Sequence, residues 1–409
     1  MITLDQVRAL DSADPLGRFR DRFFLPEGII YLDGNSLGAL PKAAAARQRA
    51  MVEEEWGCEL IRSWNTRGWI EAPQRVGAKI AALIGAKPNE VIVADSTSVN
   101  LFKLIVAAAA LAPGRRQILS EAGNFHTDLH IASGAAELSG LRLEVVEREG
   151  IEAATAIGPD TNLLLLTHVH FKAGFRFDMA EMTARAKAAG ALTLWDLSHS
   201  AGAVPLDLNG AGAELAVGCG YKYLNGGPGA PAFLYVAESL QDRLMPPLRG
   251  WMGHAEPFAF TDDYRPAPGI DRFLVGTPPM LSLAALESGV ESFEGADKHL
   301  LWAKSVAQFN LFADLVEAGC PELACVSPRD PERRGSHISF RHPNAFELCQ
   351  ALIADGVIGD FRAPDIVRFG LTPLYLGFED VWQAAERMRA ILDSGRWRDP
   401  RFAVRGTVT

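Results

Sequence analysis

A lysine stands between two tyrosines in a stretch rich in glycine, "GCGYKYLNGGPG" at residues 218–229. Glycine permits backbone conformations that other residues avoid and lets a ligand approach the chain closely, so this stretch predicts a shaped loop. The amine of Lys222 could pair with a carboxylate, bind a phosphate, or act as a covalent nucleophile. Residues elsewhere in the chain must distinguish these three roles.

Hydroxyl side chains follow one of the predicted strands. In "VIVADSTSVN" a strand ends near Asp95 and the chain continues into a predicted helix, where Thr97 and Ser98 stand beside the first helical amides. A helix start with hydroxyls is typical of a phosphate cradle. Taken alone, such a pair is more often an ordinary helix cap.

Carboxylates and a ring follow two further strands. In "LTLWDLSHSAG" Asp196 ends a strand and His199 comes three residues later. A buried carboxylate needs a cationic partner, because an unpaired buried charge is costly. In "EAGNFHTDLH" Phe125 and Asp128 place a ring beside a carboxylate, which suits stacking on a flat ligand. Each of these side chains alone is more often structural.

Together these residues predict one cofactor. Lys222 lies 26 residues after Asp196, at the end of the next strand, and the carboxyl ends of parallel strands share one crevice. A desolvated lysine forms a Schiff base with an aldehyde, and a carboxylate opposite a pyridine nitrogen keeps it protonated. The combination of phosphate cradle, ring, carboxylate and lysine therefore predicts a site for pyridoxal 5'-phosphate.

The elements that position these residues alternate between strand and helix. Six short apolar runs predict strands: "EVIVADS", "RQILSE", "LRLEVVE", "NLLLLTHV", "ALTLWDLS" and "PAFLYV". Between several of them lie helical stretches such as "MAEMTARAKAAG", so we expect an α/β domain with a mainly parallel sheet at residues 50–280. Residues 1–49 with 281–409 are expected to form a smaller α+β domain.

Composition excludes several classes of protein. The 409 residues carry a formal net charge of -10, which argues against a nucleic-acid partner. The five cysteines form no C-x-x-C pair, so neither a disulfide framework nor a zinc site is expected. No apolar run is long enough to cross a membrane, and no signal peptide is apparent, so we expect a cytoplasmic protein.

Nucleotide-binding motifs are also missing from the sequence. No G-x-G-x-x-G opens a helix after a strand, and there is no Walker motif and no H-E-x-x-H. The "GNSLG" at residues 34–38 follows the short strand "IIYLD" and predicts a tight turn near the cleft.

Eight segments, in order and spacing, resemble the kynureninase family over about residues 25 to 390. They are "YLDGNSLGALP", "RSWNTRGWI", "LTHVHFKAG", "WDLSHSAGAVPLDL", "GYKYLNGGPGAPAFLYV", "RGWMGHAEPF", "GTPPMLSLAALESG" and "VRFGLTPLYLGFED". The resemblance implies the pyridoxal-phosphate-dependent transferase fold type I, with a mainly parallel seven-stranded sheet, and a homodimer with a shared active site. It also implies hydrolytic cleavage of the Cβ–Cγ bond of L-kynurenine, and less well of its 3-hydroxy derivative. The products, anthranilate or 3-hydroxyanthranilate and L-alanine, belong to tryptophan catabolism.

The same resemblance implies roles for individual residues. Lys222 would form the Schiff base, with Tyr221 as a candidate proton relay or simply a hydrogen-bond donor to phosphate, and these two roles for Tyr221 stay open. The cofactor would be held by Thr97, Ser98, Phe125, Thr127, Asp128, Thr167, Asp196, His199 and Tyr221, with Trp251 and Thr277 from the neighbouring subunit. Arg368 would bind the substrate carboxylate, because arginine offers a bidentate fork. Trp64 and Gly276 would lie around the substrate aryl ring.

Two departures and two rival functions remain. The family usually has proline where His126 stands and an aromatic residue where Met252 stands, which puts the local loop shape in question. The nearest rivals are a cysteine desulfurase or an aminotransferase on the same scaffold. A desulfurase needs a mobile cysteine in a loop, whereas Cys325, in "LACVSP", has the sequence of a strand. A non-catalytic relative would be expected to lose Lys222.

Overall fold

A seven-stranded sheet forms the larger part of the protein, whose computed structural model describes residues 2–153 and 155–406. The strand order is β4-β10-β9-β8-β7-β5-β6, and only β10 runs opposite to the other strands. The strands are β4 (Val91–Val93), β5 (Gln117–Glu121), β6 (Arg142–Val146), β7 (Thr161–Thr167), β8 (Leu192–Asp196), β9 (Leu215–Gly218) and β10 (Phe233–Val236). The prediction of a mainly parallel seven-stranded sheet is thus confirmed.

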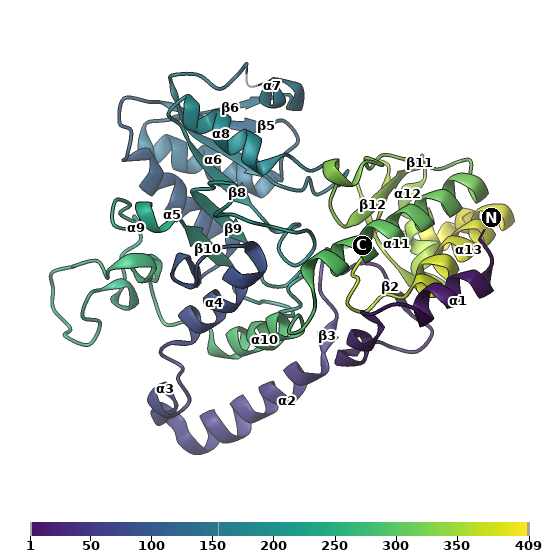
Figure 1. Ribbon diagram of the computed structural model, residues 1–409, viewed down its shortest axis with the longest axis horizontal. Coiled ribbons are helices and arrows are strands. Elements are labelled where there is room, and N and C mark those ends of the chain that lie inside the picture. Colours follow the sequence, from purple (N-terminus) through teal and green to yellow (C-terminus); the bar gives the residue numbers. More distant parts are fainter. Residues whose placement is uncertain (1, 154, 407–409) are drawn as a thin grey trace.

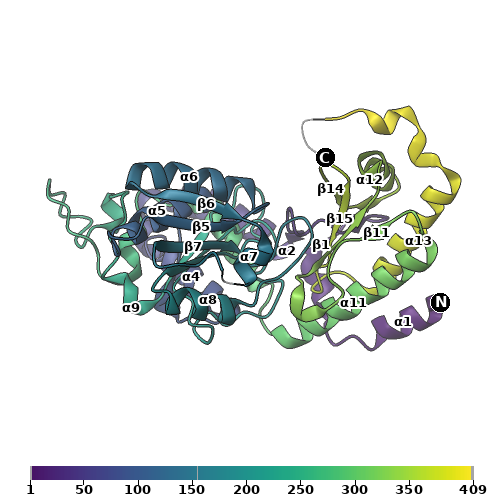
Figure 2. The same cartoon turned by 90° about the horizontal axis from the view of Figure 1, so that it is seen from above.

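Helices cover both faces of this sheet. Figure 2 shows α5 (Thr97–Ala109) and α6 (His126–Ser139) on one face, and α4 (Ala72–Ile84) and α8 (Met179–Ala188) on the other. Consecutive residues of β8 divide between two separate apolar clusters, Leu194 in one and Trp195 in the other. This alternation follows from the pleat of a strand, and it explains why neighbouring positions of a central strand such as β8 are both apolar.

A second, antiparallel sheet packs alongside the long helix α11 (Lys298–Gly319), at the right of Figure 1. Helix α10 (Met280–Glu291) precedes α11. The order of the second sheet is β11-β12-β15-β14, with helices α12 and α13 beside it. The bounds are β11 (Ala324–Cys325), β12 (His337–Arg341), α12 (Ala345–Ala354), β14 (Asp360–Arg362), β15 (Ile366–Gly370) and α13 (Phe378–Ser394).

The N-terminal segment forms two small two-stranded sheets near the second sheet. Strand β2 (Ile30–Tyr31) pairs in parallel with β13 (Val357–Ile358), and β1 (Phe23–Phe24) pairs with β3 (Leu40–Pro41). Helix α1 (Leu4–Ser12) packs on α13. The domain boundaries at residues 50 and 280 stay a prediction.

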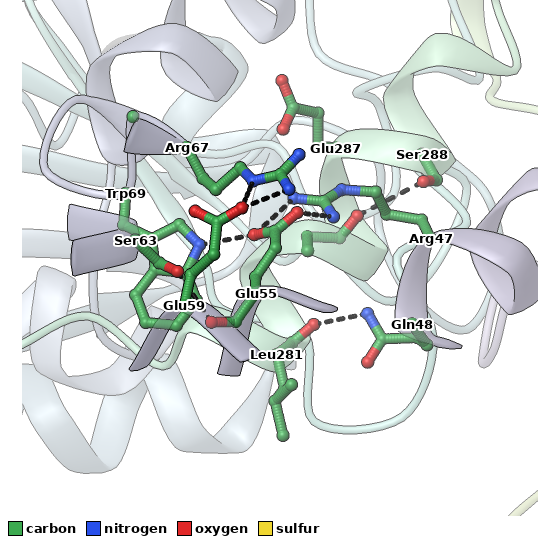
Figure 3. A network of polar contacts seen from close by, with 12 residues as sticks. Arg47, Gln48, Glu55, Glu59, Ser63, Arg67, Trp69, Leu281, Glu287 and Ser288 are labelled. Atoms are coloured by element: carbon green, nitrogen blue, oxygen red, sulfur yellow. Dashed lines mark hydrogen bonds and ion pairs between the residues drawn. The ribbon is translucent and has the colours of Figure 1, made fainter. Parts of the chain in front are cut away.

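An arm projects from the body of the molecule below α4 and α10 (Figure 1). Helix α2 (Lys42–Ala50) continues as a π-helical segment, Met51–Glu59, and ends in the short α3 (Ser63–Thr66). Figure 3 shows the polar network that fixes its end: Glu55 accepts from Arg47 at 2.5 Å and from the Trp69 indole at 2.6 Å. Because the Glu55 side chain is only 5% exposed, these charged and polar partners offset its burial.

Within residues 2–153 and 155–406, no helix is long and apolar enough to cross a membrane. The same part of the chain holds no cluster of three or more histidine, cysteine or acidic side chains that could bind a metal ion. All five cysteines are free thiols.

Candidate active site

A cavity of about 220 Å³ lies at the carboxyl ends of the central strands. It gathers ten of the residues singled out from the sequence: Thr97, Ser98, Phe125, Thr127, Asp128, Thr167, Asp196, His199, Tyr221 and Lys222. Three further lining residues, Ser96, Phe171 and Ser198, were not predicted. They are neighbours of predicted positions or follow a predicted strand, but their residue types carry no chemical signal of their own.

The sheet brings the polar residues together. Thr167 and Asp196 end β7 and β8 and are register partners, and Asp196 in turn stands opposite Val217 of β9. The loop that carries Lys222 begins directly after β9. Three adjacent parallel strands therefore deliver a hydroxyl, a carboxylate and an amine to one edge, as expected for this type of sheet.

Close backbone contacts explain the glycines around Lys222. A Cβ on Gly220 would lie 2.4 Å from the carbonyl oxygen of Pro231, and one on Gly226 would lie 2.6 Å from the carbonyl oxygen of Gly220. The N–H of Gly226 donates to that same Gly220 oxygen at 2.9 Å. The chain thus folds back on itself tightly, and only glycine fits at these two positions.

Lys222 Nζ lies 3.1 Å from Nε2 of His199. The histidine is 3% exposed, and burial first and the Lys222 charge second hold its pKa well below the usual value. The ring is therefore neutral, and its Nε2 can accept a hydrogen bond from the Lys222 amine. The same Nζ lies 5.7 Å from the centroid of the Phe125 ring and 5.8 Å from that of Tyr221.

Two buried carboxyl groups share the floor of the cavity. Burial and the neighbouring Asp196 raise the pKa of Asp128 well above its ordinary value, which favours the neutral form of that carboxyl group. Asp196 accepts hydrogen bonds from the N–H of Ser198 at 2.8 Å and from its hydroxyl at 2.6 Å. Thr167 donates to Asp128 at 3.3 Å. A carboxyl group whose neutral form is favoured therefore lies beside one that two donors hold.

The start of helix α5 forms another wall. Ser96 caps the helix, with its hydroxyl accepting from the N–H of Val99 at 3.4 Å, and Thr97 and Ser98 are the first two helical residues. Their backbone N–H groups have no partner within a helix, and the helix dipole favours an anion there. This geometry fits a phosphate.

The buried Lys103 fixes that helix start through an ion pair with the more exposed Asp95. Lys103 on α5, 0% exposed, donates at 2.7 Å both to Asp95 and to the carbonyl oxygen of Phe273. Asp95 itself has a positive φ of 47°, an uncommon conformation for a residue with a side chain. Lys103 therefore ties the turn before α5 to the segment that leads to Gly276 and Thr277.

Five predicted residues lie outside the small cavity. Gly276 and Thr277 line an adjoining cavity of about 560 Å³, which also touches Ser96 and Tyr221. Trp251 is 37% exposed and packs edge-on against Phe258, with ring centroids 5.6 Å apart.

Trp64 and Arg368 are the remaining two. Trp64 lies in α3 and packs edge-on against Trp69, with centroids 5.8 Å apart. Arg368 lies in β15, and its guanidinium donates to the carbonyl oxygen of Phe171, a lining residue of the small cavity. Arg368 therefore lies next to the small cavity through Phe171 but does not line it.

The two departures from the family pattern fall at one exposed and one buried position, His126 and Met252. His126 begins helix α6, and its ring centroid lies 4.5 Å from that of Phe125. Met252 is 7% exposed and belongs to the apolar cluster that also contains Phe273. Neither substitution removes a lining residue of the small cavity.

Cys325 is not placed as a nucleophile. It lies in β11, as its sequence predicted, and its Sγ is 3.6 Å from the carbonyl oxygen of Ser327. Burial raises the pKa of its thiol, which lowers its reactivity at neutral pH.

These residues fit pyridoxal phosphate. The cavity offers a helix start for a phosphate, a ring for stacking, a carboxylate and an amine. His199 adds a buried Nδ1 that has no hydrogen-bond partner in the described part of the chain. A buried polar atom without a partner is costly, so a ligand that supplies one is favoured.

Comparison of folds defines the class. A cysteine desulfurase from Thermococcus onnurineus NA1 superposes with a TM-score of 0.78 at 21% identity, covering 92% of this chain and 98% of that one. A structure described as a C-DES mutant with glycine covalently linked to its PLP cofactor gives 0.77 at 18% identity, with 90% and 98% covered. The fold is that of the fold type I pyridoxal-phosphate enzymes.

Sequence comparison then narrows the class to one family. Kynureninases of Burkholderia mallei (strain SAVP1) and Pseudomonas fluorescens are each 50% identical to this chain over 417 residues, with 100% of both chains covered. The family model described as the kynureninase C-terminal domain matches residues 301–388. The chain belongs to the kynureninase family.

Proposed function

We propose that this protein is a kynureninase, which hydrolyses L-kynurenine to anthranilate and L-alanine with pyridoxal phosphate as its cofactor. One observation carries the proposal: the amine of Lys222, beside the neutral His199, shares the small cavity with Phe125 and Asp196. This set of groups occurs in a chain that is 50% identical along its whole length to curated kynureninases.

The cofactor-binding residues follow from the cavity. Thr97, Ser98 and the amides of α5 would hold the phosphate, Phe125 would stack on the ring, and Asp196 would pair with the ring nitrogen. Thr127, Asp128, Thr167 and His199 would complete the pocket. When bound, the cofactor supplies an electron sink that stabilises negative charge on the substrate α-carbon.

Lys222 is placed to move protons. Once its amine is free, it would take the proton from the substrate α-carbon, and the neutral ring of His199 at 3.1 Å would hold the amine in place. His199 stays neutral because its pKa is held well below the ordinary value, so it does not place a second positive charge beside the amine. Lys222 is thus the general base of the proposed reaction.

Tyr221 retains two possible roles. Burial, followed by Cys219, raises the pKa of its hydroxyl, so the group stays protonated at neutral pH. A protonated hydroxyl can donate to the phosphate, or it can pass a proton to the substrate β-carbon. We propose the relay as a role to be tested against simple phosphate binding.

The overall reaction balances with one water. Water adds to the γ-carbonyl of kynurenine, the Cβ–Cγ bond breaks, and a proton is delivered to Cβ, which gives anthranilate and L-alanine. Arg368 would bind the α-carboxylate, while Trp64 and Gly276 would surround the aryl ring. L-Kynurenine is proposed as the better substrate and 3-hydroxy-L-kynurenine as the poorer one.

A homodimer with a shared site is part of the proposal, in which Trp251 and Thr277 would reach the phosphate of the neighbouring subunit. Trp251 is 37% exposed, and its neighbours Phe258 and Phe260 are 63% and 81% exposed. Exposed aromatic side chains gathered in one loop are typical of a surface that is covered in an assembly. This loop follows helix α9 (Glu238–Gln241) and lies at the left of Figure 1.

Product analysis separates the proposed function from its rivals. The purified protein with pyridoxal phosphate is incubated with L-kynurenine, L-cysteine, or L-kynurenine plus a 2-oxo acid. A kynureninase gives anthranilate and L-alanine in equal amounts without an oxo acid. Sulfide release from cysteine alone would instead support a desulfurase, and a product that requires the oxo acid would support an aminotransferase.

A further inference from the structure

Arg368 is a buried cation whose charge is matched by one carboxylate. It is 1% exposed, and Asp360 of β14 is its register partner across the sheet. Its Nε donates to Oδ1 of Asp360 at 2.8 Å, and its Nη2 donates to Oδ2. Asp360 thus binds one edge of the guanidinium, the edge formed by Nε and Nη2, through two charge-assisted hydrogen bonds.

The other donors of Arg368 meet neutral acceptors. Nη2 also donates to the hydroxyl of Ser36 at 3.0 Å, and Nη1 donates to the carbonyl oxygen of Phe171. A charge-assisted hydrogen bond is about twice as strong as a neutral one. An incoming carboxylate would therefore displace Ser36 and Phe171 more readily than Asp360. Because Phe171 lines the cavity of Lys222, this edge of the guanidinium adjoins that cavity.

A second arginine shares the same carboxylate. Arg362 donates to Oδ2 of Asp360 at 2.5 Å and to Ser36 at 3.3 Å. A further acid, Asp33, is near, but burial first and Asp360 second raise its pKa to about 7. Below neutral pH the cluster consequently holds two guanidinium groups against one ionised carboxylate. One positive charge remains for an anion.

We propose that Asp360 is a positioning residue of the proposed reaction, holding Arg368 side-on so that its opposite edge receives the substrate α-carboxylate. Arg362 supplies the positive charge that Asp360 would otherwise cancel. This inference rests on the proposed role of Arg368 in substrate binding.

The turn at residues 34–38 connects this cluster to the lysine loop. Ser36 donates to Asp360 at 2.7 Å, and two residues further on the N–H of Gly38 donates to the carbonyl oxygen of Tyr221 at 2.8 Å. A Cβ on Gly38 would lie 2.4 Å from the carbonyl oxygen of Lys222. The turn therefore fixes the distance between the loop of Lys222, on the side of the substrate amine, and Arg368, on the side of the substrate carboxylate.

The test measures carboxylate preference in the holoenzyme. Spectral titrations with L-alanine and with ethylamine, which lacks the carboxylate, give the ratio of their dissociation constants for the wild type, Asp360→Asn and Arg368→Gln. We expect Asp360→Asn to lower the preference for L-alanine about tenfold or more, and to raise the KM for L-kynurenine with a smaller change in kcat. The cofactor absorption spectrum should not change.

The matched control is Asp365→Asn, because Asp365 lies in the same hairpin and pairs with the surface residue Arg341 at 3.0 Å. For this variant, the ratio of the dissociation constants of L-alanine and ethylamine should equal that of the wild type. If Asp360→Asn also keeps the wild-type preference while Arg368→Gln loses it, the positioning role is overturned and the substrate-binding role of Arg368 stands. If Arg368→Gln keeps the preference, the proposed role of Arg368 fails, and the inference with it.

A second variant covers the case in which Asp360→Asn does not fold, as judged by thermal unfolding. Arg362 has a side chain that is 36% exposed, so Arg362→Gln should fold. In titrations below neutral pH, where the cluster has one unmatched positive charge, we expect this variant to lower the preference for L-alanine several-fold. An unchanged preference would overturn the role given to Arg362.

Discussion

Lys222 and His199 form a buried pair in which the amine Nζ lies 3.1 Å from Nε2 of a neutral imidazole. The pair sits where β8 and the loop after β9 meet, at the floor of the small cavity. A neutral acceptor orients an amine without cancelling its charge. Because His199 follows β8 and Lys222 follows β9, the packing of the central sheet sets the distance between the amine and its acceptor.

Replacing His199 tests the orienting role of this pair. In His199→Phe the ring volume is kept but the acceptor is lost, so we expect kcat to fall on the order of 10²-fold while the cofactor still binds. Steady-state rates of anthranilate release and a cofactor titration measure both effects. His199→Asn, which keeps a polar group, should lose less activity. A wild-type kcat in His199→Phe would show that the contact has no role.

The two buried acids should respond differently to the same substitution. A raised pKa favours the neutral form of Asp128, which an amide resembles, so Asp128→Asn should keep kcat within about tenfold of the wild type. Asp196→Asn removes a carboxyl group that Ser198 holds with two hydrogen bonds, and should lower kcat by about 10²-fold or more. Equal losses in the two variants would contradict this difference between the two acids.

A buried histidine should make the protein less stable in acid. The burial of His168 lowers its pKa to about 3, while in the unfolded chain it titrates near 6.5. Below pH 6.5 the unfolded chain binds a proton that the folded one does not. The contribution to stability is therefore fully present above that pH and declines by about 1.4 kcal/mol per pH unit as pH falls toward 3.

The variant His168→Asn, whose amide can still reach the hydroxyl of Ser200, removes this contribution. Denaturant unfolding at pH 7.5 and 5.5 should show that the loss of free energy on acidification is about 1 kcal/mol smaller in the variant than in the wild type. His299→Asn, at an exposed position, is the control. An identical pH dependence in wild type and His168→Asn would refute the prediction.

The sheet and much of the cavity followed from the sequence. The six apolar runs all form strands, and those at the centre of the sheet are covered on both faces. The seventh strand, β9, was not among the six runs, although a strand was expected to end before Lys222. The polar residues after these strands could be grouped because the carboxyl ends of parallel strands meet at one edge.

Long-range contacts were beyond sequence reasoning. The pairing of Arg368 with Asp360 depends on the register of β14 and β15, and the contact of Gly38 with Tyr221 joins positions 183 residues apart. Ser198 and Phe171 enter the cavity through loop geometry, which no periodic pattern encodes. The π-helical Met51–Glu59 was also missed, because its helix type depends on the buried Glu55 network rather than on local propensity.

The buried Lys103 should matter for both stability and cofactor affinity. Lys103→Ala leaves Asp95 and the carbonyl oxygen of Phe273 without their shared partner, so we expect the free energy of unfolding to fall by about 2 kcal/mol. The helix start at Ser96 should loosen, which weakens cofactor binding. Denaturant unfolding and a cofactor titration check both effects. Lys87→Ala, which removes a surface pair with Glu238, should behave like the wild type and serves as the control.

The most direct test of the central claim compares wild type with Lys222→Ala in the presence of pyridoxal phosphate. Absorption spectra report covalent attachment of the cofactor, and fluorescence reports anthranilate after L-kynurenine is added. The account predicts a visible band from lysine-bound cofactor and anthranilate release in the wild type, with both lost in Lys222→Ala. Anthranilate release by Lys222→Ala at the wild-type rate, or a wild-type protein that shows no such band, would contradict it.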